Sequence, residues 1–168
     1  MKAALLLLFA VVFGACESEG EPATTGDADH DSAFAALQDR GGAAEGMGVD
    51  QYASAHRFDD RPNGGRIELQ DTAGDDAAVD RIRTHMQQIA EAFASGDFSA
   101  PGFVHAMDEV PGTRVMAERR ELIRYEYAPL PRGGEVRIET ADSTARRAIH
   151  EFLAFQRLDH RAMGHDLH

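Results

Sequence analysis

The stretch "SAHRFDDRPNGGRIELQ", residues 54–70, decides the fold of this chain. Its central Pro-Asn-Gly-Gly segment, residues 62–65, is typical of a tight turn, and both flanks are compatible with β-strands. Ile67 and Leu69 alternate with polar residues, so they share one face of a strand. The stretch therefore predicts a β-hairpin with one buried face.

A helix is expected directly after this hairpin, capped by Asp75 or Asp76 and ended by Gly96. Its apolar residues recur at spacings of three and four, as on one face of an α-helix: Val79, Ile82, Met86, Ile89 and Phe93.

The same plan occurs again in the second half. "ELIRYEYAPLPRGGEVRIET", residues 121–140, predicts a second hairpin with alternating strands, and "ADSTARRAIHEFLAFQRLDH", residues 141–160, predicts a second helix capped by Asp142. We therefore predict an α+β domain of ββα-ββα order, in which two helices pack on one face of a four-stranded antiparallel sheet. Residues 96–120 are broken by Pro and Gly, and we expect a long loop there with at most a short helical turn, of the kind that is often functional.

Charge and composition narrow the possible partners. The chain has a net charge of −12, and no run of basic residues is present that would neutralise phosphates, so we do not expect a nucleic-acid partner. Basic and acidic residues alternate on the predicted outer face of the sheet, which favours cross-strand pairing and solubility over an adhesive surface. The residues concerned are Arg66, Glu68, Arg124, Glu126, Arg137 and Glu139.

The N-terminal residues predict where the protein is located in the cell. The apolar run after Lys2 is too short to span the ~30 Å hydrocarbon core but suits a signal peptide. "FGAC", residues 13–16, resembles the lipobox of bacterial lipoproteins, and Cys16 is the only cysteine of the chain. The resemblance implies that residues 1–15 are removed and that Cys16 carries diacylglycerol and anchors the protein to a membrane.

The residue after the cysteine predicts which membrane carries the protein. Glu17 is not the aspartate that retains enterobacterial lipoproteins in the inner membrane, so we expect the protein on the periplasmic side of the outer membrane. The alternative is a secreted soluble protein with an incidental cysteine.

Three further segments are expected after the signal peptide. Residues 16–50 are rich in acidic and small residues and predict a flexible linker, although "HDSAFAALQDRG" is compatible with a short helix. Residues 51–162 predict a single domain, and residues 163–168 a disordered tail that contains histidines.

Four histidines are candidates for one metal site at the edge between the sheet, the helices and the long loop. His56 shares a strand face with Phe58, His85 and His160 lie at the margins of apolar helix faces, and His105 lies in the loop; His150 points away and is only an outer candidate. Imidazole suits copper or zinc, and a nearby methionine such as Met107 would favour copper. Asp108 or Asp159 would serve as a ligand or orient a ring.

Local hydrogen bonding of each histidine is the simpler interpretation, because no recognised ligand spacing is present. The segments "GDFSAP" (96–101) and "IHEFLAFQRLDH" (149–160) are similar to parts of uncharacterised secreted bacterial proteins that contain histidines, which implies no established activity. His165 and His168 of the tail are expected to be adventitious ligands at most.

Catalysis is not expected. The only cysteine is at the anchor, no serine has the context of a triad, and the Gly-Gly pairs lie in hairpin turns. Two functions follow: a cell-envelope lipoprotein that binds copper or zinc through histidines, or a structural or protein-interaction lipoprotein with incidental histidines.

Overall fold

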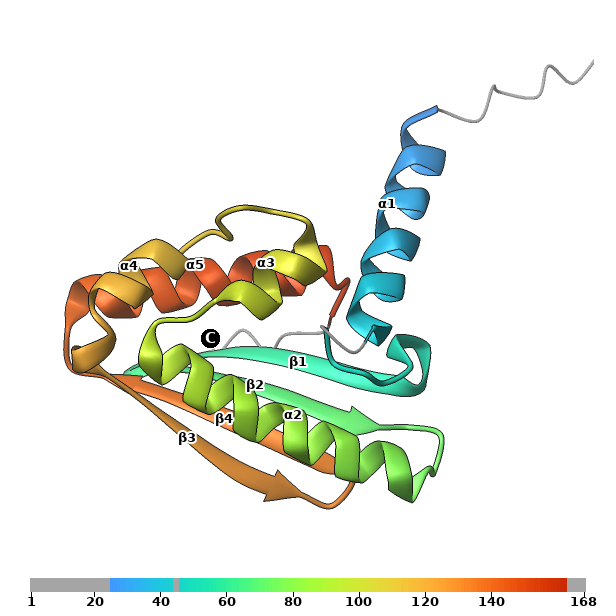
Figure 1. Ribbon diagram of the computed structural model, residues 1–168. Helices are drawn as coiled ribbons and strands as arrows, with labels where there is room; N and C mark the ends of the chain where they lie inside the picture. Colours follow the sequence, from blue (N-terminus) through green and yellow to red (C-terminus); the bar gives the residue numbers. More distant parts are fainter. Residues whose placement is uncertain (1–24, 44–45, 163–168) are drawn as a thin grey trace, which may run out of the picture.

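The computed structural model describes residues 25–43 and 46–162 (Figure 1). In this part of the chain, one antiparallel sheet contains four strands in the order β1-β2-β4-β3. The strands are β1 (Ser54–Arg61), β2 (Gly64–Asp71), β3 (Ile123–Leu130) and β4 (Gly133–Thr140). Each sequence-predicted hairpin is present, and the pairing of β2 with β4 joins the two halves of the chain in the middle of the sheet.

The two long helices begin at aspartate caps, as their sequences predict. They are α2 (Asp76–Ser95) and α5 (Ser143–Asp159). The Asp75 carboxylate accepts a hydrogen bond from the Ala77 amide, and that of Asp142 accepts bonds from the Thr144 and Ala145 amides. These bonds satisfy amides that have no partner within the first helical turn.

Both long helices cover the same face of the sheet. A side chain at Gly65 in β2 would collide with Leu153 of α5, and one at Gly134 in β4 would contact Met86 of α2. Gly134 pairs with Leu69, which lies four residues after Gly65, and side chains on a strand alternate between faces. The two glycines therefore lie on one face, and the predicted α+β architecture is confirmed.

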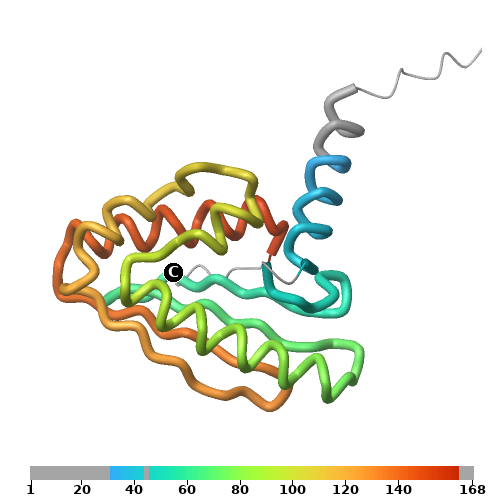
Figure 2. Tube along the Cα trace, in the orientation of Figure 1, coloured from blue at the N-terminus to red at the C-terminus, as the bar shows by residue number. Residues whose placement is uncertain are grey.

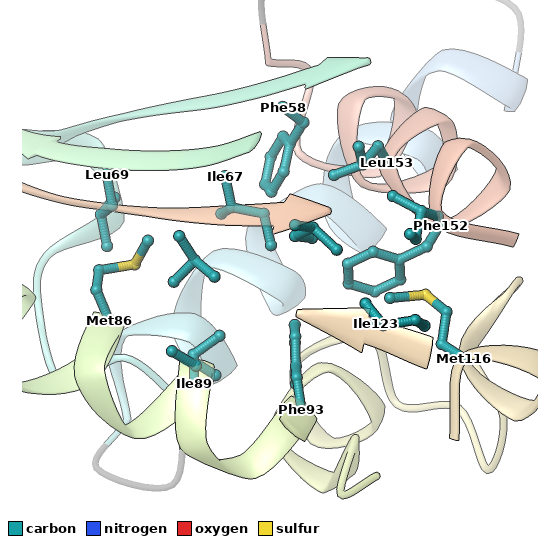
Figure 3. Close-up of a cluster of buried hydrophobic side chains, with 14 of the residues drawn as sticks. Phe58, Ile67, Leu69, Met86, Ile89, Phe93, Met116, Ile123, Phe152 and Leu153 are labelled. Carbon is teal, nitrogen blue, oxygen red and sulfur yellow. The ribbon is translucent and has the colours of Figure 1, made fainter. Parts of the chain in front are cut away.

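The core fills the space between this face and the helices (Figure 3). Phe93 of α2 and Phe152 of α5 meet edge to face, with their ring centroids 5.8 Å apart. The largest side chains that are almost fully buried come from both helices and both central strands. They include Leu69, Ile82, Met86, Ile138, Ile149 and Leu153.

The segment between the two halves is more ordered than the predicted loop. It contains α3 (Ser99–His105), α4 (Thr113–Glu118) and a 3-10 turn, η2 (Arg120–Leu122). Val104 and Met116 from these short helices are buried in the core region. The segment therefore closes one side of the domain and places His105 at the end of α3.

The predicted linker extends too far, because its last part packs on the domain. α1 (Thr25–Gly42) is followed by a turn and by η1 (Gln51–Ala53), and Leu37 and Val49 are only 2% and 4% exposed. The trace in Figure 2 shows that α1 rises away from the sheet and reaches the domain at its C-terminal end. Among the described residues, no helix is long and apolar enough to cross a membrane.

The outer face of the sheet carries an ion-pair network. Arg66 of β2 pairs with Asp59 of β1 and with Glu135 of β4, and both carboxylates are almost fully buried by their neighbours. Arg137 also pairs with Glu135. Of the residues expected to pair across strands, only Arg124 and Glu139 do so among the described ion pairs, at 4.0 Å, and the main cross-strand partners of Arg66 lie outside that set.

Candidate functional site

The four candidate histidines line one pocket between the sheet, α2, α3 and the end of α5. His56 comes from β1, His85 from α2, His105 from the last residue of α3, and His160 from the C-cap of α5. The enclosed space is about 70 Å³. Methionine, aliphatic and aromatic side chains form the rest of the wall, including Met47, Phe58, Leu69, Met86, Phe93 and Phe152.

The strand register directs His56 into the pocket. His56 pairs with Leu69 and Phe58 pairs with Ile67, and all of these residues lie on the face that the helices cover. The sequence-based placement of His56 beside Phe58 is therefore correct.

His160 lies at the centre of the cluster. Its ring centroid is 5.0 Å from that of His56, 5.1 Å from that of His105 and 5.6 Å from that of Phe58. The side chain is at the end of α5, where the His160 amide bonds to the Gln156 and Leu158 carbonyls. The His160 ring thus lies about 5 Å from the rings of both His56 and His105, which come from two other elements.

His105 is held in place by two side chains of α5. Its Nδ1 lies 2.5 Å from Asp159 Oδ2, and its Nε2 lies 3.0 Å from the Gln156 side-chain oxygen. The His105 side chain is almost fully buried, and the Phe155 ring packs against it edge to face. An Nδ1–H that donates to a carboxylate fixes both the tautomer and the orientation of an imidazole.

Burial keeps three of the rings neutral. Burial, and then repulsion from the protonated form of His85, lowers the pKa of His56 from 6.5 to about 4. Burial alone lowers the pKa of His85 to about 4. The pKa of His160 falls to about 2, because of burial and then because of its neighbours His56 and His105. At neutral pH these rings therefore carry free nitrogen lone pairs rather than charge.

Two buried polar atoms in the pocket have no hydrogen-bond partner among the described residues. They are Nδ1 of His160 and the side-chain nitrogen of Gln156. A buried polar atom without a partner typically costs ~1–3 kcal/mol, so such atoms are uncommon and often mark a site for an ion or water. His160 is 8% exposed, and its Nδ1 atom is itself buried.

Met47 was not among the sequence-based candidates. Its sulfur lies 3.4 Å from Nε2 of His56, at the wall of the pocket. The only available signal was that Met47 is one of few large apolar residues in an acid-rich segment. Met107 and Asp108, which the sequence placed near the site, instead line a separate groove beside α3 and α4.

His150 does not belong to the cluster. Its Nε2 lies 2.9 Å from the Gly64 carbonyl and 3.1 Å from that of Arg61, so the ring ties α5 to the turn between β1 and β2. A local structural contact therefore accounts for His150, and we do not retain it as a metal ligand. His165 and His168 lie outside the described residues.

The side chains are not arranged around a metal in advance. Across residues 25–43 and 46–162, no three His, Cys, Asp or Glu side chains already have positions that would hold an ion. Asp159 touches His105 but is not part of the pocket wall. The wall itself contains no carboxylate, serine, threonine or cysteine among the described residues. The chemistry that the site offers is that of imidazole and thioether groups.

Comparisons with known protein families, with curated proteins and with solved structures find no significant match to this chain.

Proposed function

We propose that the domain binds one transition-metal ion, copper or zinc, through His56, His105 and His160. The observation that supports this most strongly is the meeting of these rings, from β1, α3 and α5, around a lone pair of His160 that has no partner among the described residues. His85 lines the same pocket and is the fourth candidate. Binding, rather than catalysis, is the proposed role.

The ring separations agree with a shared ion. With metal–nitrogen distances of ~2.0–2.1 Å, two imidazoles on a tetrahedral ion place their ring centroids about 5 Å apart. His160 is 5.0 Å from His56 and 5.1 Å from His105. The rings must turn about their outer side-chain torsion to direct their nitrogens at one point, and that torsion is soft. Binding therefore needs rotation of rings, not movement of the backbone.

The protonation state of the pocket also supports metal binding. A metal ion must displace any proton from an imidazole before it binds. Because burial lowers the pKa of His56 and of His160 well below neutrality, no proton competes for these two rings at neutral pH.

Asp159 would support His105 as a ligand. Metal-bound histidines generally donate their other ring N–H to a carboxylate or carbonyl, which orients the ring and raises its basicity. In this domain Nδ1 of His105 contacts Asp159, which leaves Nε2 for an ion, but Nε2 faces an acceptor, the Gln156 side-chain oxygen, so the ion would have to displace any proton on Nε2. Gln156 contacts that Nε2 and would have to turn aside.

The proposed location is the cell envelope. A lipid on Cys16 would anchor the chain to the periplasmic face of the outer membrane, and residues 17–24 together with α1 would separate the lipid from the domain. In this setting the metal site would face the periplasm without crossing the bilayer.

Calorimetric titration of residues 17–162 with Zn(II), and with Cu(I) under anaerobic conditions, tests the function without the tail histidines. We expect one tight equivalent of at least one metal. His160→Phe and His56→Phe keep an aromatic ring in the pocket but remove the ligand nitrogens, and each should abolish tight binding. His150→Gln is the matched control, since its amide can still donate to the turn carbonyls, and it should bind like the wild type.

Absence of a tight equivalent for both metals would overturn the proposal, as would unchanged binding in folded His160→Phe protein. In that case the structural or protein-interaction role becomes the better account of the domain.

A further inference from the structure

We infer that the ion is copper(I) and that Met47 supplies a thioether ligand beside His56. This inference rests on the proposed metal-binding function and goes beyond it, because it selects one metal, one oxidation state and one ligand outside the predicted set.

The turn after α1 holds Met47 against the pocket. Its amide donates to the Gly41 carbonyl at 2.7 Å, which fixes the turn to the end of α1. Its sulfur points towards β1. It lies 3.4 Å from Nε2 of His56 and 3.9 Å from the side-chain nitrogen of Gln51. The neighbouring Gly46 is also part of the pocket wall.

The separation of Met47 and His56 matches that of two ligands on one ion. For bond lengths of ~2.0 Å to nitrogen and ~2.3 Å to sulfur, a tetrahedral angle places the two donor atoms about 3.5 Å apart. The observed distance of 3.4 Å already meets this condition without any change of backbone. An ion beside these two atoms would be next to His160, whose ring centroid is 5.0 Å from that of His56.

The charge of the wall favours a monovalent ion. The wall contains no carboxylate among the described residues, and burial lowers the pKa of His56, His85 and His160 well below neutrality, while Asp159 contacts His105 from outside the wall. The cost of moving an ion out of water grows with the square of its charge, so a divalent ion costs about four times as much as a monovalent one in the same pocket. Copper(I) with neutral ligands leaves a single positive charge, which the Asp159 carboxylate behind His105 would balance.

The preference of each metal for soft or hard ligands also favours copper(I). Thioether sulfur selects copper(I), whereas zinc is bound mainly by thiolate, imidazole and carboxylate, and copper(II) prefers tetragonal nitrogen and oxygen sites. A site made of imidazoles and the Met47 thioether, in an apolar wall that also contains Met86, therefore fits copper(I) best.

The test measures Cu(I) and Zn(II) affinity of residues 17–162 and of two methionine variants, with bathocuproine disulfonate as the Cu(I) competitor. Met47→Leu removes the sulfur but keeps the size of the side chain. Met116→Leu is the matched control, because Met116 is fully buried in the core and is not part of the pocket wall. We expect Met47→Leu to weaken Cu(I) binding by on the order of tenfold or more. Zn(II) binding should stay unchanged in both variants.

Each outcome separates this inference from the function on which it rests. Unchanged Cu(I) affinity in Met47→Leu, or tighter wild-type binding of Zn(II) than of Cu(I), overturns the inference and leaves the histidine site in place. Failure of both metals to bind the wild type overturns both. X-ray absorption of the Cu(I) complex gives a direct reading: a sulfur neighbour at ~2.3 Å is expected in the wild type and should be missing in Met47→Leu.

Discussion

Acidification of the metal-free domain tests whether the pocket histidines are buried as neutral groups. In the unfolded chain each takes up a proton near its ordinary pKa of 6.5, whereas burial lowers the pKa of His56 and His85 to about 4 and that of His160 to about 2 in the folded protein. The unfolded state therefore binds these protons at higher pH than the folded state. The free energy of unfolding is at its full value above pH 6.5 and falls as the pH drops towards 4.

The size of this effect follows from proton linkage. Between pH 7 and pH 5, one histidine of this kind lowers the free energy of unfolding by about 2 kcal/mol, and three lower it by roughly 6 kcal/mol. Total stabilities of small domains are about 5–15 kcal/mol, so the loss should be large. Asp71 does not contribute in this range, because the hydrogen bond from Arg132 lowers its pKa from 3.8 and its contribution is lost only in stronger acid.

Urea denaturation at pH 7 and pH 5, followed by circular dichroism in the presence of a chelator, measures the difference. His160→Phe should lose about 2 kcal/mol less than the wild type on acidification, because one titrating group is gone. His150→Gln should keep the wild-type difference, because His150 lies outside the pocket. Equal stability of the wild type at both pH values would refute the reasoning.

Three further perturbations test other parts of the structure. Leu37→Ala should lower the free energy of unfolding by ~2–5 kcal/mol in urea denaturation, because it removes a side chain that is 2% exposed; no change would mean that α1 does not pack on the domain. Gly112→Ala should destabilise more than Gly74→Ala, because both glycines have positive φ but only at Gly112 would the new Cβ collide with the Ala148 carbonyl; equal melting temperatures would contradict this packing. Cys16→Ser should move the protein from the membrane fraction to the soluble fraction, and persistence in the membrane would remove the lipid-anchor proposal.

Periodicity was sufficient to predict the two hairpins, the helices α2 and α5 and the inward direction of individual side chains. Alternation along residues 54–70 gives the inward direction of His56, and the spacing of apolar residues gives the marginal position of His85 and His160 on their helices. Whether these rings meet depends on the strand order and on the path of the chain between the halves, and neither has a local sequence signal. The structure provides both, and all three residues line one pocket.

The linker prediction for residues 16–50 was based on amino-acid composition, which does not show that a few of these residues pack on the domain. Residues 16–50 are acidic and rich in small residues, which is typical of a linker, yet Leu37 and Val49 are buried against the domain and Met47 reaches the pocket. For His150, helical spacing predicted the direction of the side chain but not its hydrogen-bond partner. Helical spacing directs it away from the apolar face of α5, but the turn between β1 and β2 lies there and accepts its hydrogen bond.

The most direct test of the central claim is a crystal structure of the metal-loaded domain with anomalous diffraction data at the absorption edge of the metal. The account predicts one strong anomalous peak in the pocket, at ~2.0–2.1 Å from ring nitrogens of His56 and His160. A peak only at surface side chains or at the tail histidines, with the pocket rings in their present positions, would contradict it.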